Sequence, residues 1–158
     1  MLRISKMSDY AVVLVSKMAG TSERLTLDDL VTATAVPLAS VRKLMRLLTL
    51  AGICVGKKGA GGGYCLQRSA SDISVLEVLE AVDGELALTQ CAQQGDCECS
   101  LQPHCEVKHS WQVINGVIRR TLSQLSIADL SQSAHDGGQQ LVHLLATDRS
   151  LMIHQDLN

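Results

Sequence analysis

A short cysteine-rich segment carries the most evident chemistry of the sequence. Residues 91–105, CAQQGDCECSLQPHC, hold four of the six cysteines of the 158-residue chain. Their spacings are Cys91-x5-Cys97, Cys97-x-Cys99 and Cys99-x5-Cys105. Thiols gathered this closely can form a disulfide knot, a zinc site or an iron–sulfur cluster. The segment is therefore a candidate redox or metal site, and the rest of the sequence has to discriminate among the three.

The N-terminal sequence and the cysteine spacing favour one of these sites. The opening MLRISKMSDY lacks the apolar stretch of a secretory signal, and the longest apolar run, AVVLV, is too short to cross a bilayer. We therefore expect a cytoplasmic protein without a membrane partner, whose thiols are kept reduced. Structural zinc sites favour CxxC knuckles, and the segment has none. An iron–sulfur cluster is thus the favoured cofactor, with zinc as the alternative.

Charge is divided unevenly along the chain. Residues 1–68 carry ten Lys and Arg against four Asp and Glu, a net charge of +6, whereas residues 69–158 carry −8. A basic half indicates an anionic partner, most commonly nucleic acid. Hydrophobic residues make up 46% of the chain but aromatic residues only 2%, so we expect a mainly α-helical fold with an aliphatic core.

The basic half begins with two helix signals. Ser8 is a candidate N-cap for a mostly buried helix that ends at Gly20. Thr26 and Asp29 form a capping box that starts a second, short helix, TLDDLVTATA. The turn-like break VPLAS follows, as expected between the two helices of a helix-turn-helix motif.

A third helix, ending at Gly52, completes this motif. One of its faces is apolar, with Leu38, Val41, Leu44, Met45 and Leu48 at helical spacing. The opposite face is small and basic, as in a recognition helix that enters the major groove of DNA. The candidate DNA-contacting residues on this face are Ala39, Ser40, Arg42, Lys43 and Arg46.

A β-hairpin is expected directly after this helix. The strand candidates ICV and YCL flank the glycine-rich turn GKKGAGGG, which is the arrangement of a DNA-binding wing. In this turn, Lys57, Lys58 and Gly59 are candidates for phosphate or minor-groove contact. The turn lacks the GKS or GKT ending of a nucleotide-binding loop. Cys54 and Cys65, on the two strands, are expected to be reduced, half-buried thiols.

Two further helices are expected around the cysteine segment. The first, SVLEVLEAVDG, is capped by Ser74 and stopped at Gly84. The second carries an apolar stripe suited to helix–helix association, formed by Trp111, Ile114, Ile118, Leu122 and Leu125. Because dimeric DNA-binding proteins read two half-sites, we expect a homodimer, with core packing inside one subunit as the alternative role of the stripe.

The chain accordingly divides into four parts. We expect a winged helix-turn-helix DNA-binding domain at 1–84 and a cysteine-rich cluster-binding loop at 85–106. A dimerisation helix and a short following helix occupy 107–130, and the tail at 131–158 has no assigned role. The five histidines show no HExxH spacing, and no arrangement of catalytic residues is evident, so we expect neither an enzyme nor a small-molecule substrate.

The sequence contains, in this order, the segments KMSDYAVVLVSKMA, PLASVRKLMRLLTLAGI, GAGGGYCL, ISVLEVLEAVDG, LTQC and the C...C...W sequence. Together they resemble the Rrf2 family of bacterial winged-helix repressors of the IscR and NsrR type. The final stretch, INGVIRRTLSQLSIADL, is most similar to the branch that regulates the SUF iron–sulfur assembly operon. The resemblance implies a homodimeric regulator that carries a cluster, commonly [2Fe-2S], before a long dimerisation helix.

The resemblance also implies a set of ligands. Family members present three cysteines, and Cys91 and Cys105 match two of them, with Cys99 favoured over Cys97 as the third. The fourth ligand varies. Some members have a histidine where this chain has Lys108, with His109 one position away, and others have an acid matching Asp9, which would reach the cluster from the partner subunit. His104 is a further candidate, and capping of its own helix is the alternative role of Asp9.

The sequence thus leads to two hypotheses of function. The first is a cluster-sensing repressor that binds a double-stranded DNA operator of iron–sulfur assembly genes. The second is a zinc-bound or thiol-redox adaptor whose winged helix contacts other proteins. The basic outer face of the third helix and the wing lysines favour the first hypothesis.

Overall fold

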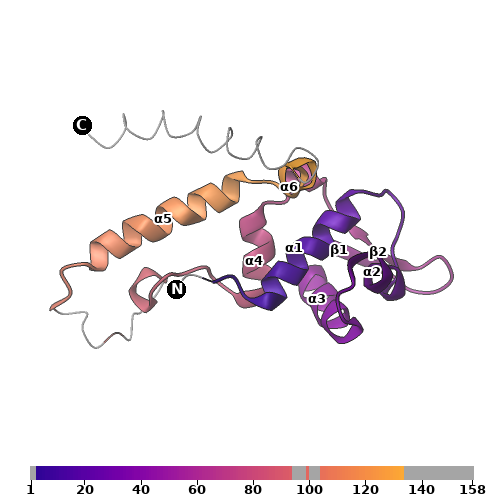
Figure 1. Ribbon diagram of the computed structural model, residues 1–158, viewed down its shortest axis with the longest axis horizontal. Coiled ribbons are helices and arrows are strands. Elements are labelled where there is room, and N and C mark those ends of the chain that lie inside the picture. Colours follow the sequence, from indigo (N-terminus) through magenta and orange to yellow (C-terminus); the bar gives the residue numbers. More distant parts are fainter. Residues whose placement is uncertain (1–2, 94–98, 100–103, 134–158) are drawn as a thin grey trace.

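Helices and one β-hairpin make up the structure, a computed structural model that describes residues 3–93, 99 and 104–133 (Figure 1). The first helices are α1 (Lys6–Ala19), α2 (Leu27–Thr34) and α3 (Leu38–Leu50). The hairpin strands β1 (Cys54–Lys57) and β2 (Gly63–Leu66) follow, then the 3-10 turn η1 (Ala70–Asp72) and α4 (Val75–Asp83). The last elements are η2 (Gln90–Ala92), α5 (Lys108–Gln124) and α6 (Ile127–Ser133). This architecture confirms the mainly α-helical winged helix-turn-helix expected from the sequence.

The core is aliphatic, as the scarcity of aromatic residues predicts. It lies between α1, α3 and α4, with contributions from α2, β1 and α6. The largest completely buried side chains are those of Leu14, Leu30, Leu44, Met45, Leu48, Ile53, Ile73 and Ile127. On α3 the apolar spacing is confirmed for four of the five expected positions. Leu38, at the start of the helix, is instead 39% exposed.

Two of the predicted helix starts are confirmed and one is wrong. Capping boxes formed by Thr26 with Asp29 and by Ser74 with Glu77 begin α2 and α4. Helix α1, however, is capped by Ser5, whose hydroxyl accepts a hydrogen bond from the Ser8 amide at 3.0 Å. Ser8 cannot act as the N-cap because it lies inside the first turn, where it is buried and donates to Asp83 Oδ2 at 2.7 Å.

The two strands pair antiparallel, with Cys54 opposite Leu66 and Val55 opposite Cys65. The two wing cysteines are therefore not direct cross-strand partners. Beyond the hairpin, Leu25 and Tyr64 exchange backbone hydrogen bonds of 2.9 and 2.8 Å. Because Leu25 directly precedes the α2 cap, these bonds fix the wing to the helix-turn-helix motif.

Helix α5 projects from this body, and the chain then returns to it through α6 (Figure 1). The return is made by backbone hydrogen bonds from Val75 N to Leu125 O at 2.8 Å and from Ile127 N to Ile73 O at 2.9 Å. Ile127 is completely buried in the core. The core of the winged helix thus contains a residue from beyond the cysteine segment. Among the described helices, none has the length and apolar character needed to span a bilayer.

We predict that Ile127→Ala destabilises the whole winged helix, because it leaves a cavity in the shared core. The expected loss is about 2–4 kcal/mol in the free energy of unfolding, the usual cost of truncating a buried isoleucine. Urea unfolding followed by circular dichroism measures it. Gln132→Ala, on the exposed side of the same helix, is the control and should change little. A loss equal to that of the control would show that α6 is dispensable for the core.

Candidate nucleic-acid interface and cysteine segment

The turn between α2 and α3 is held by one buried side chain and one unusual backbone conformation. Ala35 ends α2 in the left-handed region at φ 57°, and its amide donates to Val31 O at 2.8 Å. The next residue, Val36, is buried in the core. Pro37 then precedes α3 with φ −57°, a value that its ring favours. The buried Val36 side chain and the backbone conformations of Ala35 and Pro37 therefore fix the turn that joins the two helices.

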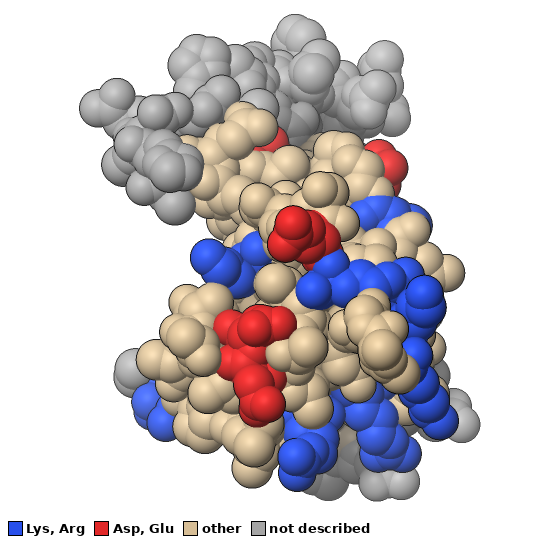
Figure 2. All heavy atoms as spheres, turned by 90° about the vertical axis from the view of Figure 1, so that its right-hand side faces the viewer, with Lys and Arg blue, Asp and Glu red and all other residues tan. Residues whose placement is uncertain are grey.

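The outer face of α3 carries the predicted basic residues. Ala39, Arg42, Lys43 and Arg46 are exposed, and Ser40 is half-buried. The first turn of α3 is fully described and contains no acidic residue, so its positive dipole end is not neutralised there. Figure 2, which views the end of the molecule that carries the wing, shows Lys and Arg side chains along the right-hand and lower parts of the view. The arrangement suits a polyanion.

The tip of the wing is a tight turn that only glycine can make. The Gly62 amide donates to Gly59 O at 2.9 Å, and a Cβ on Gly62 would lie 2.5 Å from Lys57 O. Such a contact is far shorter than real Cβ atoms allow. Lys57 and Lys58 are exposed on this turn, next to Gly59. The glycines therefore hold the two lysines on a compact loop rather than on a flexible linker.

The wing and the recognition helix face a common groove of about 530 Å³. Arg46, Thr49 and Leu50 line it from α3, and Lys57 and Lys58 line it from the wing. Three basic residues from two different elements, α3 and the wing, thus line one groove. The remaining predicted residues of α3 lie toward its N-terminal end.

The start of the cysteine segment lies beside the N-terminal half of α5, where Gln112 Nε2 donates to Cys91 O at 3.5 Å. Within the part of the chain that the structure describes, Cys91, Cys99 and Cys105 are free and half-buried. Cys97 lies outside the described residues, as do residues 134–158 of the predicted tail. No group of three or more potential metal-ligating side chains is gathered among the described residues. The structure therefore does not discriminate between Cys97 and Cys99.

The chemistry of these donors nevertheless fits a thiolate-bound metal centre. The three described cysteines are free of disulfides and half-buried, so their sulfurs are available as ligands. The Thr89 hydroxyl lies 3.2 Å from Cys91 Sγ. When Cys91 is a thiolate, only Thr89 can donate in this contact, and such a bond stabilises the ligand form.

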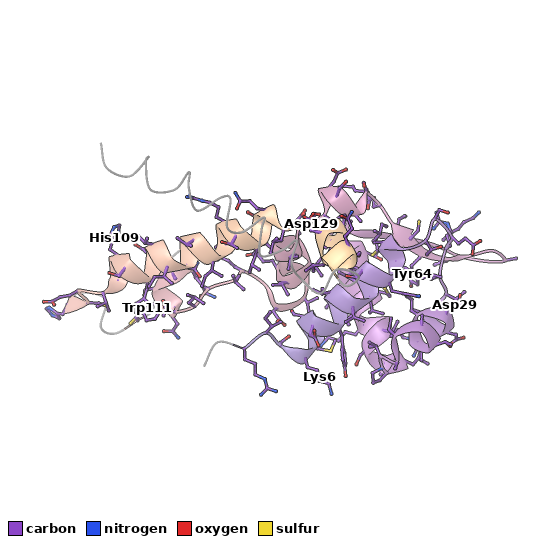
Figure 3. The ribbon with its side chains drawn as sticks, turned by 45° about the horizontal axis from the view of Figure 1, so that its top comes forward. Lys6, Asp29, Tyr64, His109, Trp111 and Asp129 are labelled. Carbon is purple, nitrogen blue, oxygen red and sulfur yellow. The ribbon has the colours of Figure 1, made fainter. Side chains whose placement is uncertain are left out.

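The other proposed ligands are dispersed over the surface. Asp9 is exposed on α1, His104 is exposed shortly before α5, and His109 is exposed in the first turn of α5. Figure 3 shows His109 and Trp111 on different sides of α5. Lys108, where the family resemblance implies a histidine in some members, is half-buried at the start of that helix. Within one chain these residues do not converge with the described cysteines.

Cys54 differs from the loop cysteines. Burial, with a smaller contribution from Cys65, raises the pKa of its thiol to about 12. Its sulfur lies 4.0 Å from Met18 Sδ in the core. Cys54 is therefore a structural thiol, buried rather than half-buried as expected from the sequence, whereas Cys65 is half-buried as predicted.

The apolar stripe predicted on α5 serves two different surfaces. Leu122 and Leu125 pack against the core of their own subunit. Trp111 and Ile114 remain exposed, while Ile118 is half-buried. The exposed apolar face includes Ile114 of the stripe, 44% exposed, and extends to Val113 and Val117 outside it, 53% and 44% exposed. The dimer hypothesis thus applies to the exposed part of the stripe together with Val113 and Val117.

Polar residues that sequence reasoning missed hold the segment ahead of Cys91. Arg119 of α5 forms a close ion pair with Glu80 of α4 and donates to Leu86 O at 3.2 Å. Asn115, one turn earlier, is buried against the same segment. The available signal was an amide placed four residues after Trp111 in an otherwise apolar pattern.

Comparison with known proteins agrees with this geometry. A profile of the Rrf2 family, described as an iron-dependent transcriptional regulator, matches residues 4–133. The chain is 28% identical over 147 residues to the HTH-type transcriptional regulator IscR of Escherichia coli O1:K1 / APEC, covering 90% of each protein. It is 28% identical over 131 residues to IscR of Vibrio atlanticus, covering 82% of this chain and 75% of that relative.

Solved structures share the fold at low sequence identity. The IscR structure from T. potens has a TM-score of 0.66 at 22% identity, covering 86% of this chain and 90% of that one. CymR, described as the global cysteine regulator of B. subtilis, also has a TM-score of 0.66, at 18% identity, covering 84% and 98%. These two structures therefore establish the shared architecture.

Proposed function

The chain belongs to the Rrf2 family of transcriptional regulators, and from this premise we propose that it is a homodimeric, iron–sulfur cluster-sensing repressor. Its relatives are DNA-binding regulators and not enzymes. The observation that carries the DNA-binding part is the convergence of Arg46, Lys57 and Lys58 on one groove between α3 and the wing. Double-stranded DNA is the polyanion that a recognition helix and a wing bind together. A protein that binds operators on the bacterial chromosome would be located in the cytoplasm.

The residues of α3 and the wing would divide the work of recognition. Arg42 and its neighbours on α3 would contact base edges in the major groove. The wing lysines would contact phosphates or the edge of the minor groove. The Leu25–Tyr64 backbone bonds keep these two parts in a fixed relation.

The sensing part of the proposal rests on the cysteine segment. Cys91 and Cys105 would hold the cluster, with Cys99 as the third thiolate and Asp9 of the partner subunit as a candidate fourth ligand. A bound cluster, commonly [2Fe-2S], supplies a centre whose presence depends on iron and oxidants. The free thiols and the Thr89 contact at Cys91 support thiolate ligation. We further propose that the regulated genes are those of iron–sulfur cluster assembly, as the family resemblance suggests.

The dimer would form through the exposed apolar face of α5. Val113, Ile114 and Val117 form a continuous patch on one side of this helix. Contiguous exposed apolar surface on a soluble protein usually marks an interface. A dimer through α5 would present two recognition helices to two half-sites of an operator.

We expect Lys58→Ala and Arg42→Ala to impair DNA binding in different ways. Loss of a phosphate contact at Lys58 should weaken binding to all sequences and reduce the salt slope by about 1. Loss of Arg42 should instead relax the preference at one operator position, costing about 1–3 kcal/mol there. A binding series over salt and operator variants measures both. Arg120→Ala, an equal charge loss on α5, is the control, and identical behaviour of the two test variants would refute the division of roles.

We expect the double substitution Val113→Glu with Val117→Glu to yield folded monomers. Both side chains are more than 40% exposed in one subunit, so the added charges leave the core intact but prevent burial between two copies. Analytical ultracentrifugation measures the mass. Ser123→Glu places a charge elsewhere on the same helix and should leave the dimer unchanged. If the double variant remains dimeric, another surface forms the interface.

We expect Cys91→Ala and Cys105→Ala to lose the visible absorption of the anaerobically purified protein while remaining helical. Removing a thiolate ligand releases the cluster, but neither residue belongs to the core. Cys99→Ala should behave in the same way, and Cys97→Ala should keep its colour. Iron and sulfide assays, with circular dichroism, measure the outcome. Zinc in place of iron and sulfide would favour the adaptor alternative, and equal operator affinities of holo and apo protein would remove the sensing role.

A further inference from the structure

One buried amide on α5 holds the backbone that carries Cys91. Asn115 is 3% exposed, although both neighbouring positions of the helix are exposed. Its Oδ1 accepts a hydrogen bond from Leu88 N at 3.1 Å, and its Nδ2 donates to Leu86 O and Ala92 O at 3.4 Å each. One side chain thus binds three backbone groups spread over residues 86–92.

These bonds surround Cys91 on both sides in the sequence. Two go to residues before it, and the third goes to Ala92, immediately after it. Gln112, one turn earlier on α5, adds a weaker bond from Nε2 to Cys91 O at 3.5 Å. The short turn η2 therefore lies against α5 at a defined place, and the Cys91 backbone cannot move far from the helix while the bonds to Asn115 persist. Figure 1 shows this segment running beside α5.

A second attachment joins the same segment to the winged helix. Arg119 lies four residues after Asn115, and so on the same face of α5. It pairs with Glu80 of α4 and also donates to Leu86 O at 3.2 Å. Leu86 O is thus shared by Asn115 and Arg119. The Leu86 carbonyl therefore links Asn115, which holds the backbone around Cys91, to Arg119, which pairs with Glu80 of α4.

An asparagine is an expensive choice for general packing at this position. A buried amide gives up its hydration, and it is tolerated here because its hydrogen bonds to the backbone of the segment replace those lost to water. What the amide adds is geometric specificity, because its donor and acceptor groups fit one register of the segment. We propose that Asn115 is a positioning residue that fixes Cys91 relative to α5 and α4. This inference rests on the proposed function in giving Cys91 the role of a cluster ligand.

The experiment measures Cys91 directly in the full-length apo protein, so that it does not depend on cluster loading. Wild type, Asn115→Leu and Asn115→Ala are reduced, exposed to iodoacetamide, and analysed by peptide mass spectrometry. Without the amide, the segment opens more often and Cys91 should be alkylated on the order of three- to tenfold faster. The rate at Cys105 serves as the internal reference and should not change, because the three bonds of Asn115 go to residues 86–92.

Ser123→Ala is the matched control, since it removes a polar side chain from the exposed side of the same helix and should leave both rates unchanged. Circular dichroism confirms that each variant is folded, and the alanine variant serves if leucine does not fit. A Cys91 rate in both folded Asn115 variants equal to that of wild type would overturn the proposal. Equal acceleration at Cys91 and Cys105 would also overturn it, because that result indicates general loosening.

A second measurement separates this inference from the proposed function. In cluster-loaded protein, the Asn115 variants should lose visible absorption several-fold faster than wild type when an iron chelator is added. If wild type binds no cluster but the Asn115 variants accelerate alkylation of Cys91 alone, the sensing proposal fails and the positioning role stands. If wild type binds a cluster and the variants match it in both measurements, the positioning role fails and the sensing proposal stands.

Discussion

The ion pair between Arg119 and Glu80 is the contact on which the arrangement of the functional parts depends. Helix α5 leaves the body of the protein, and only its C-terminal end, through Leu122 and Leu125, packs on the core. The N-terminal half is held by polar groups instead. The pair is largely shielded, with side chains 25% and 27% exposed, so it is less screened than a surface pair. The pair joins α5 to α4, and Arg119 also bonds Leu86 in the segment that leads to Cys91, so all three parts are held at one place.

Charge separates along the chain in a way that matches this arrangement. The net charge of +6 on residues 1–68 gathers at the recognition helix and wing, and the acidic remainder includes Glu80, Glu77 and Asp83 of α4. These acids are used internally, for the Arg119 pair, for the α4 capping box and for the bond from Ser8. These three acidic side chains therefore stabilise contacts within the protein, while the basic residues of α3 and the wing remain available to a polyanion.

Local rules predicted those parts of the fold that are determined locally. The capping boxes of α2 and α4 follow from side chains three residues apart, and the apolar face of α3 follows from helical spacing. The local pattern wrongly predicts Ser8 as an N-cap, because Ser8 instead bonds Asp83, which lies 75 residues away in the sequence. Helical spacing predicts the α5 stripe as one surface, although the stripe divides between the core and solvent, because periodicity does not say which neighbour covers a face. Asn115 was missed for the same reason, since its partners are backbone groups that no sequence pattern identifies.

The position of Asn115 and Arg119 on one face of α5 also limits how a cluster could control DNA binding. A ligand shifts a conformational equilibrium only through different contacts in the two states. If cluster loss displaces Cys91, the first bonds affected are those of Asn115, and the shared Leu86 carbonyl then changes the surroundings of Arg119. Since Arg119 holds α4, and Asp83 at the end of α4 binds Ser8 of α1, the displacement reaches the winged helix through direct contacts. In a dimer joined through α5, a small rotation of that helix against α4 would alter the separation of the two recognition helices, which is the quantity that half-site spacing selects.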